Sequence, residues 1–108
     1  MIRHMVLFNL KPELEAGDRE WLFGQIQGLA KIAAVKRMAV GKLLDPREDW
    51  YKAKMAADYG WALTMEFENE DALYAYQQDP YHVSVAQEIR KRVTAVKGMD
   101  FVSLTQSS

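Results

Sequence analysis

The sequence contains no cysteine and only three prolines among its 108 residues. The lack of cysteine excludes disulfide bonds, thiolate nucleophiles and thiolate metal ligands. Only two histidines are present, His4 and His82, and neither has another donor at a metal-binding spacing, so we expect no metal and no other cofactor. Any chemistry must therefore use His, Tyr, Asp, Glu, Lys or Arg side chains.

An excess of charge of one sign and long apolar runs are missing too. The formal net charge is −1, and no stretch collects the lysines and arginines needed to bind phosphates, so we expect no nucleic-acid partner. The apolar start is too short to span a membrane and lacks a signal-peptide cleavage pattern. We therefore expect a cytoplasmic protein, without a membrane partner, that forms one domain over residues 1–108 with residues 105–108 as a frayed tail.

Alternating apolar residues predict four β-strands, at residues 2–10, 35–44, 61–68 and 98–106. In the first strand, His4, Val6 and Phe8 lie on one face, while Met5 and Leu7 lie on the other. Because both faces are mostly apolar, we expect this strand to be central in a sheet.

Three helices are predicted between these strands. The first begins with Asp18 as its cap and ends near Ala34, with a buried stripe made by Leu22, Ile26, Leu29 and Ala33. The second begins after Asn69 and puts Leu73 and Tyr76 on one face. The third begins at Asp79-Pro80, and its apolar stripe contains His82, Val85, Ile89 and Val93.

This order of elements predicts an α+β, ferredoxin-like fold, in which a four-stranded antiparallel sheet carries its helices on one face. The other face then needs a cover. Met5, Leu7, Met38 and Val40 are predicted to point to that face, which is more apolar than a monomer normally leaves in water. We therefore predict a homodimer that packs sheet on sheet with two-fold symmetry.

His4, Tyr76 and His82 are predicted to converge. His4 shares its strand face with Phe8, and Tyr76 and His82 point inward from helices that cover this face. The positive end of the helix dipole and desolvation both favour a neutral imidazole at His82, whereas the carboxylate of Asp79 opposes them. These side chains therefore suggest a pocket for a small ligand between sheet and helices.

The segments "IRHMVLFNLK" and "DPYHVSVAQEIRKRVTAVKGMDF" resemble the stress-responsive dimeric α/β barrel (Dabb) family over nearly the whole chain. The resemblance implies ferredoxin-like chains whose sheets join into a barrel across a dimer. It also points to an enzyme branch, the plant polyketide cyclases of the olivetolic acid type. On matching positions, His82 would be the base, Tyr76 the orienting phenol and His4 a pocket residue. The chain departs from that branch at Trp61, where the branch has a further histidine, and at Gln25, where it has a tyrosine.

Three interpretations of the function stay open. The first is a Dabb-domain homodimer of uncertain role that binds a small, partly apolar molecule, with His4, Phe8, Gln25 and Trp61 lining the pocket. The second is a cofactor-independent cyclase or lyase acting on a carbonyl compound, with His82 and Tyr76 as catalytic residues. The third is a structural, stress-related dimer without catalysis, in which these side chains only fill the core.

Residues 45–60 form a long connection for so small a domain, and Trp50, Tyr51 and Met55 give it apolar surface. Two roles stay open for this connection: a lid over the pocket, or a segment that reaches to a partner subunit.

Overall fold

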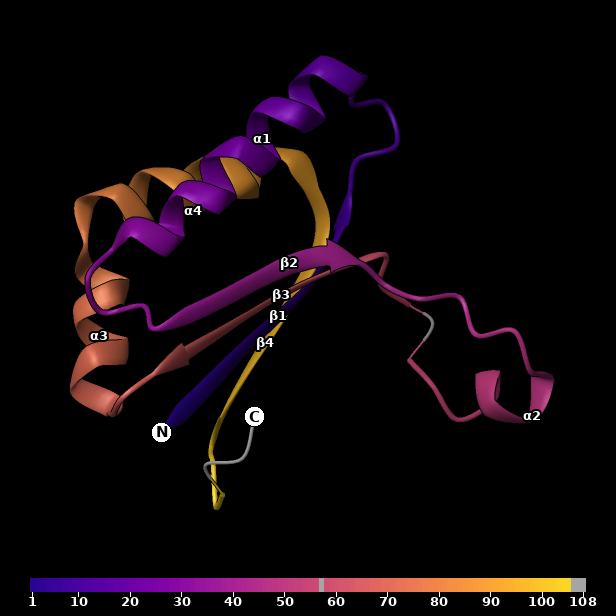
Figure 1. Ribbon diagram of the computed structural model, residues 1–108. Helices are drawn as coiled ribbons and strands as arrows, with labels where there is room; N and C mark the ends of the chain where they lie inside the picture. The colour runs from indigo at the N-terminus through magenta and orange to yellow at the C-terminus, as the bar shows by residue number, and fades with distance from the viewer. Residues whose placement is uncertain (57, 106–108) are drawn as a thin grey trace.

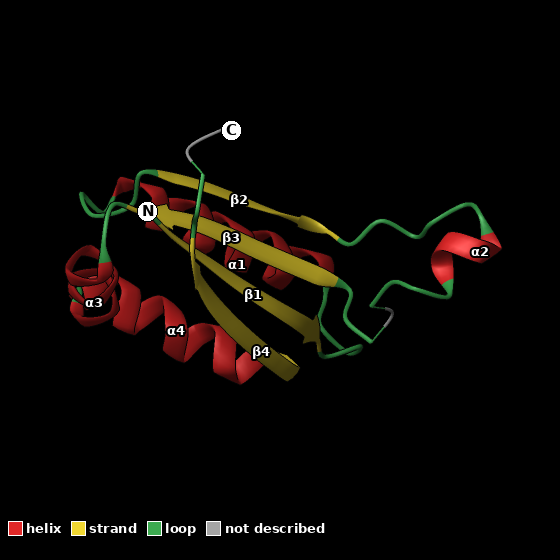
Figure 2. Ribbon diagram, turned by 90° about the horizontal axis from the view of Figure 1, so that it is seen from below, coloured by secondary structure: helices red, strands yellow, loops and turns green. Residues whose placement is uncertain are grey.

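The structure is a computed structural model that describes residues 1–56 and 58–105 (Figure 1). Within them, four antiparallel strands form one sheet in the order β2-β3-β1-β4: β1 (Ile2–Leu10), β2 (Arg37–Lys42), β3 (Trp61–Phe67) and β4 (Val93–Val102). The helices α1 (Ala16–Gly28), α3 (Glu70–Gln78) and α4 (Pro80–Arg92) cover one face of this sheet (Figure 2). The ferredoxin-like prediction is confirmed. Of the predicted tail, residues 106–108 lie outside the described residues.

The core lies between the sheet and these three helices. β1 is central, and its side chains alternate between the two faces as predicted. His4 and Phe8 lie on the face that the helices cover, since His4 pairs with the buried Met65 and Phe8 is itself buried. The largest fully buried side chains are Phe8, Leu22, Ile26, Leu29, Met65, Phe67, Tyr76 and Val85. No described helix is both long and apolar enough to pass through a bilayer.

The prediction that Met38 and Val40 of β2 point away from the helices is wrong. Met38 pairs with Met65 and Val40 pairs with Leu63, so both residues point toward the helices and pack against the core. The small residues Ala39 and Gly41 take the opposite face. This assignment is physically reasonable, since the larger apolar side chains of a strand gain more from burial.

The open face of the sheet therefore has a composition different from the predicted one. Met5 and Leu7 lie there as predicted, and their β4 partners Met99 and Lys97 lie beside them, with Phe101 further along the strand. Met99 is 60% exposed and Phe101 is 46% exposed. On the open face, the apolar side chains of the central strand β1 therefore lie next to apolar side chains of the edge strand β4.

The boundaries of α1 and β4 differ from the prediction. The cap of α1 is Glu15, so Asp18 lies in the first turn of the helix, and the helix gives way at Gly28 to a short 3-10 turn, Leu29–Lys31. β4 begins at Val93, directly after α4 ends, which places Val93 in the strand instead of on the helix stripe.

Residues 43–56 and 58–60 form an arm between β2 and β3 that contains the short helix α2 (Asp49–Lys52). Both views show the arm extending beyond the end of the sheet, away from the three covering helices (Figures 1 and 2). In both views the arm lies away from α3 and α4, which carry Tyr76 and His82, so the structure does not support a lid on the chain's own predicted pocket.

Candidate functional site

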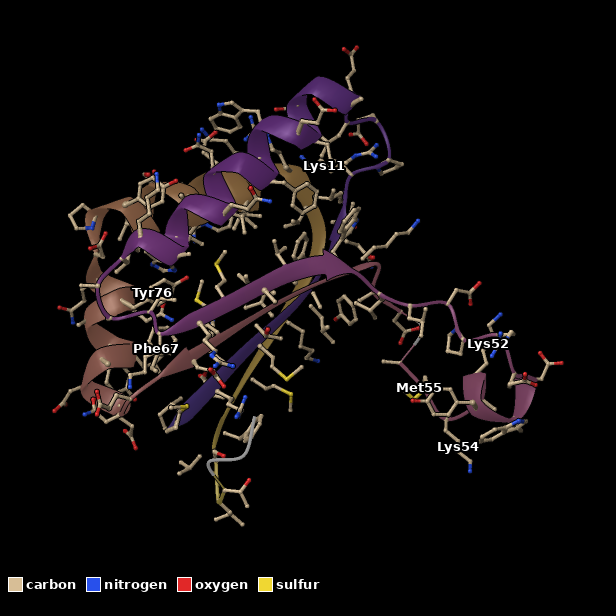
Figure 3. All side chains as sticks on the ribbon, viewed as in Figure 1. Lys11, Lys52, Lys54, Met55, Phe67 and Tyr76 are labelled. Carbon is tan, nitrogen blue, oxygen red and sulfur yellow. The ribbon has the colours of Figure 1, made fainter. Side chains whose placement is uncertain are left out.

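His4, Tyr76 and His82 come together, and we call them the histidine–tyrosine cluster. The ring centroid of Tyr76 is 4.4 Å from that of His82 and 6.3 Å from that of His4. Phe67 of β3 closes the cluster on the sheet side, with its ring centroid 5.1 Å from that of Tyr76 (Figure 3). The convergence predicted from strand parity and helix spacing is therefore present in the fold.

Two helix caps position this cluster. The Asn69 side chain accepts a hydrogen bond from Ala72 N and starts α3, which turns Tyr76 toward the sheet. One residue, Asp79, then separates α3 from α4, and its carboxylate accepts from the backbone N–H of Tyr81. This tight connection brings His82, in the first turn of α4, against the ring of Tyr76.

Hydrogen bonds determine which imidazole nitrogens are free. Nδ1 of His82 lies 3.1 Å from the carbonyl oxygen of Gln77, and a carbonyl can only accept, so Nδ1 carries the proton. Nδ1 of His4 likewise faces a carboxylate oxygen of Asp100 at 2.5 Å. In each neutral ring, Nε2 is therefore the nitrogen with the free lone pair.

The protonation states follow from burial. Burial lowers the pKa of His82 below 6.5, although the hydrogen bond to the Gln77 carbonyl opposes this shift. Burial also raises the pKa of Tyr76 well above 10, so its hydroxyl stays protonated at neutral pH. The pair thus offers a neutral imidazole beside a phenol that can donate a hydrogen bond.

Tyr76 is packed into the core. The residue is only 2% exposed, and among the described residues no buried side-chain polar atom is left without a hydrogen-bond partner.

The other predicted pocket residues lie elsewhere. Phe8 and Trp61 pair at the opposite end of β1, four positions along the strand from His4, which is about 13 Å. There Trp61 packs on Phe23 of α1, with ring centroids 4.6 Å apart. Gln25 contributes its backbone carbonyl, which accepts from the Tyr81 hydroxyl at 2.7 Å. The fold thus separates a second aromatic cluster from the histidine–tyrosine cluster.

Sequence reasoning missed Asp100, the carboxylate that holds His4. Its position inside the apolar run from Met99 to Val102 was a usable signal, because Asp100 is the one charged residue in that run. Pairing of His4 with Asp100 across β1 and β4 puts the two side chains on the same face.

Among the described residues, no group of three or more metal-ligating side chains comes together.

The fold defines the class of protein. An antiparallel four-stranded sheet with helices on one face is a ferredoxin-like α+β domain, and here the histidine–tyrosine cluster lies between that sheet and α3. Residues 2–103 match the family described as "Stress Responsive A/B Barrel Domain", Dabb, and the chain belongs to this family. The resemblance found in the sequence is thereby confirmed. The search of curated proteins gave no match.

Solved structures share the fold at low sequence identity. An Arabidopsis thaliana protein has a TM-score of 0.80 at 21% identity, with 100% of both chains covered. A dimeric ferredoxin-like protein of unknown function from Thermobifida fusca has a TM-score of 0.75 at 24% identity, covering 94% of this chain and 90% of that one. The hydroxynitrile lyase from Passiflora edulis has a TM-score of 0.79 at 16% identity, covering 98% and 96%.

Proposed function

We propose that the protein is a homodimer that binds a small, partly apolar carbonyl compound at the histidine–tyrosine cluster. The observation that carries this proposal is the contact between Tyr76 and His82, whose ring centroids lie 4.4 Å apart. A phenol that donates stands beside an imidazole whose Nε2 accepts, and this combination suits a carbonyl group with an acidic hydrogen next to it. The surrounding Phe67 and Met65 supply the apolar contact.

The edge of β4 offers the route to this site. Asp100 holds His4 there, and the Asp100 side chain is 46% exposed, so the pair opens to solvent. β4 has no further strand beside it within the described sheet. Since the three rings pack closely, a ligand entering from this edge would shift the Tyr76 or His82 side chain and not occupy a ready-made cavity.

A second candidate function is a cofactor-independent lyase or cyclase. His82 would abstract a proton through Nε2, Tyr76 would hydrogen-bond the developing oxyanion, and the released proton would return from the same imidazolium. The shared fold of the Passiflora edulis hydroxynitrile lyase favours this candidate over a purely structural one. General-base catalysis of this kind contributes about 10²–10⁴-fold, and replacement of His82 would remove that contribution.

A thermal-shift screen of small carbonyl and aromatic-acid compounds tests the ligand proposal. The screen compares wild type with His82→Ala and Tyr76→Phe, and Tyr74→Phe serves as the matched control because Tyr74 is exposed on the same helix. A ligand of the cluster stabilises wild type and the Tyr74 variant but loses its effect in the other two. Equal stabilisation of all four, or no hit, would favour a structural dimer without catalysis. Turnover assays on the hits then separate binding from catalysis.

The open face of the sheet supports the homodimer part of the proposal. Met99 and Phe101 are exposed beside Met5 and Leu7, and contiguous apolar surface of this kind marks an interface. The Thermobifida fusca protein of the same fold is described as dimeric. We expect wild type to sediment as a dimer and Met99→Glu as a monomer, whereas Tyr74→Glu, on the helical side, leaves the dimer intact.

A further inference from the structure

The open face of the sheet is divided into two unlike halves. Its residues form rows across the strands, because each one pairs with a neighbour in the adjacent strand (Figure 2). In the order β2, β3, β1, β4, the first row is Arg37, Glu66, Arg3 and Phe101, the second is Ala39, Thr64, Met5 and Met99, and the third is Gly41, Ala62, Leu7 and Lys97. Beyond the first row, short side chains cover β2 and β3, and long side chains cover β1 and β4.

The half on β2 and β3 is hollowed. A hollow of about 350 Å³ lies over Ala39 and Thr64, bounded by the first row and by Met5. Its floor is low because alanine and threonine are small. Packed protein surfaces leave few voids larger than a water molecule. A second surface that packs on this half must therefore fill the hollow with long side chains.

The half on β1 and β4 carries side chains of that kind. Met5 and Leu7 of β1 are half-buried, and Met99 of β4 is exposed. Methionine is unbranched and flexible, so it fills irregular gaps well. One half of the open face therefore has the shape that fits the other half.

Only one direction of a two-fold axis brings the unlike halves together. In the aligned class of sheet packing, the strands of two sheets stay within about 30° of each other, so the axis runs either across the strands or along them. An axis across the strands puts short side chains over short ones. An axis along the strands, between β1 and β3, puts β1 over the partner's β3 and β4 over the partner's β2.

We propose that two copies of this chain pack their open faces together about a two-fold axis that runs along the strands. The inference rests on the proposed homodimer and adds its arrangement. Met99 then lies over Ala39 of the partner subunit, and Met5 lies over Thr64 of the partner subunit. Because the two-fold axis repeats each contact, the methionines of each copy fill the hollow of the other.

The charges of the first row favour the same axis. Within one chain, Nη1 of Arg3 lies 2.5 Å from Oε1 of Glu66, and Nε of Arg37 lies 3.7 Å from its Oε2. The proposed axis puts Arg3 over Glu66 of the partner subunit and Glu66 over the partner's Arg3, so these four side chains alternate in sign around it. An axis across the strands at the second row would put the first row over the third, where Lys97 is the one charged residue. Complementary charges fix the register of an interface.

Because the chain has no cysteine, chemical crosslinking tests the axis directly. Ala39 and Met99 lie on the two edge strands, three strand spacings apart, which is about 14 Å. The proposed axis puts Ala39 about 10 Å from the partner's Met99, the spacing of packed sheets, but leaves each residue about 17 Å from its own copy. A bismaleimide about 10 Å long should therefore give covalent dimers of Ala39→Cys with Met99→Cys on a denaturing gel. The two single variants are the controls and should stay monomeric on that gel.

Exchange of charge gives the second readout. Arg3→Glu should raise the dimer dissociation constant by about tenfold or more, because it puts like charges together, and Glu66→Arg should do the same. An equimolar mixture of the two variants should sediment as a dimer, since each then faces the opposite charge in its partner. Arg90→Glu makes an equal change of charge on the exposed side of α4 and should leave the dissociation constant unchanged.

The outcomes separate the direction of the axis from the homodimer itself. Covalent dimers of the single cysteine variants would indicate an axis across the strands and overturn the proposed one. A wild-type dimer with no crosslink in the double variant, or with no recovery in the mixture, would also overturn the proposed axis and leave the homodimer standing. A monomeric wild type would overturn both.

Discussion

The ring of His4 and the carboxylate of Asp100 meet across the β1–β4 pair, with Nδ1 and Oδ1 2.5 Å apart although 96 positions separate them in the chain. The contact fixes the imidazole between the edge strand and Tyr76. A carboxylate on Nδ1 also selects the tautomer and leaves Nε2 as the reactive nitrogen.

Removal of the Asp100 carboxylate should allow the neutral His4 ring to exchange between its two tautomers. In Asp100→Ala, we expect the ¹⁵N shifts of the neutral ring to move toward the values of a freely exchanging imidazole. The Asp100→Asn variant should keep the wild-type pattern, because its amide oxygen still accepts from Nδ1–H. The stability change should stay below about 1 kcal/mol, since Asp100 is half exposed. Unchanged shifts in the alanine variant would argue against the bond.

Folding stability should depend on the protonation of His82. Burial lowers its pKa in the folded chain below the ordinary 6.5, so the unfolded chain binds the proton more tightly. The contribution of the neutral His82 to the free energy of unfolding is complete above about pH 6.5 and is lost as the pH falls from there toward the folded pKa. Urea unfolding between about pH 5 and 8 should show the decline in wild type, and His82→Gln should have a flatter profile. Parallel profiles would contradict the assigned shift.

Two glycines of α1 should respond oppositely to alanine. A Cβ at Gly24 meets nothing within 4 Å, so Gly24→Ala should stabilise the protein by about 0.5–1 kcal/mol through helix propensity. A Cβ at Gly28 would overlap the Tyr81 hydroxyl and lie 2.9 Å from its ring carbon Cζ. Displacing Tyr81 breaks its bond to the Gln25 carbonyl, worth about 1 kcal/mol, so Gly28→Ala should not stabilise. Thermal unfolding of the two variants checks this contrast.

The cap of α3 should matter more than that of α1. The Asn69 side chain accepts from Ala72 N at 2.9 Å, and Asn69→Ala should cost about 1 kcal/mol. Glu15 caps α1 without a side-chain bond, so Glu15→Ala should change stability by less than about 0.5 kcal/mol. Because Asn69 starts the helix that carries Tyr76, its loss should also weaken ligand binding; equal effects of the two substitutions would refute the difference in capping.

Local signals were sufficient to predict the convergence of His4, Tyr76 and His82, whereas Phe8, Trp61 and Gln25, predicted to line the same pocket, lie elsewhere. The caps at Asn69 and Asp79 and the spacing of Leu73 and Tyr76 depend on neighbouring residues only, and all of them are found in the fold. The position of His4 followed from strand alternation. The contact of His4 with Asp100 depends on which strands pair and in which register, and a single sequence does not contain that information.

The errors have tertiary causes. Val93 continues the helical spacing of Ile89, but pairing with β1 draws it into β4, where a β-branched residue packs well. Asp18 is a good cap in isolation, yet it lies in the first helical turn and binds Arg92 at the end of α4, at 2.9 Å. Met38 was assigned to the wrong face because the pairing of β2 with β3 was unknown.

The direct passage from α4 into β4 fixes the phase between a helix and a strand, because Arg92 ends one element and Val93 begins the other. A single inserted residue at this junction would reverse the alternation of β4, sending Asp100 to the open side and Phe101 toward the helices. It would therefore remove the partner of His4 and disrupt the proposed dimer surface together. Length variation in related chains should accordingly be absent at this junction and concentrate in the arm.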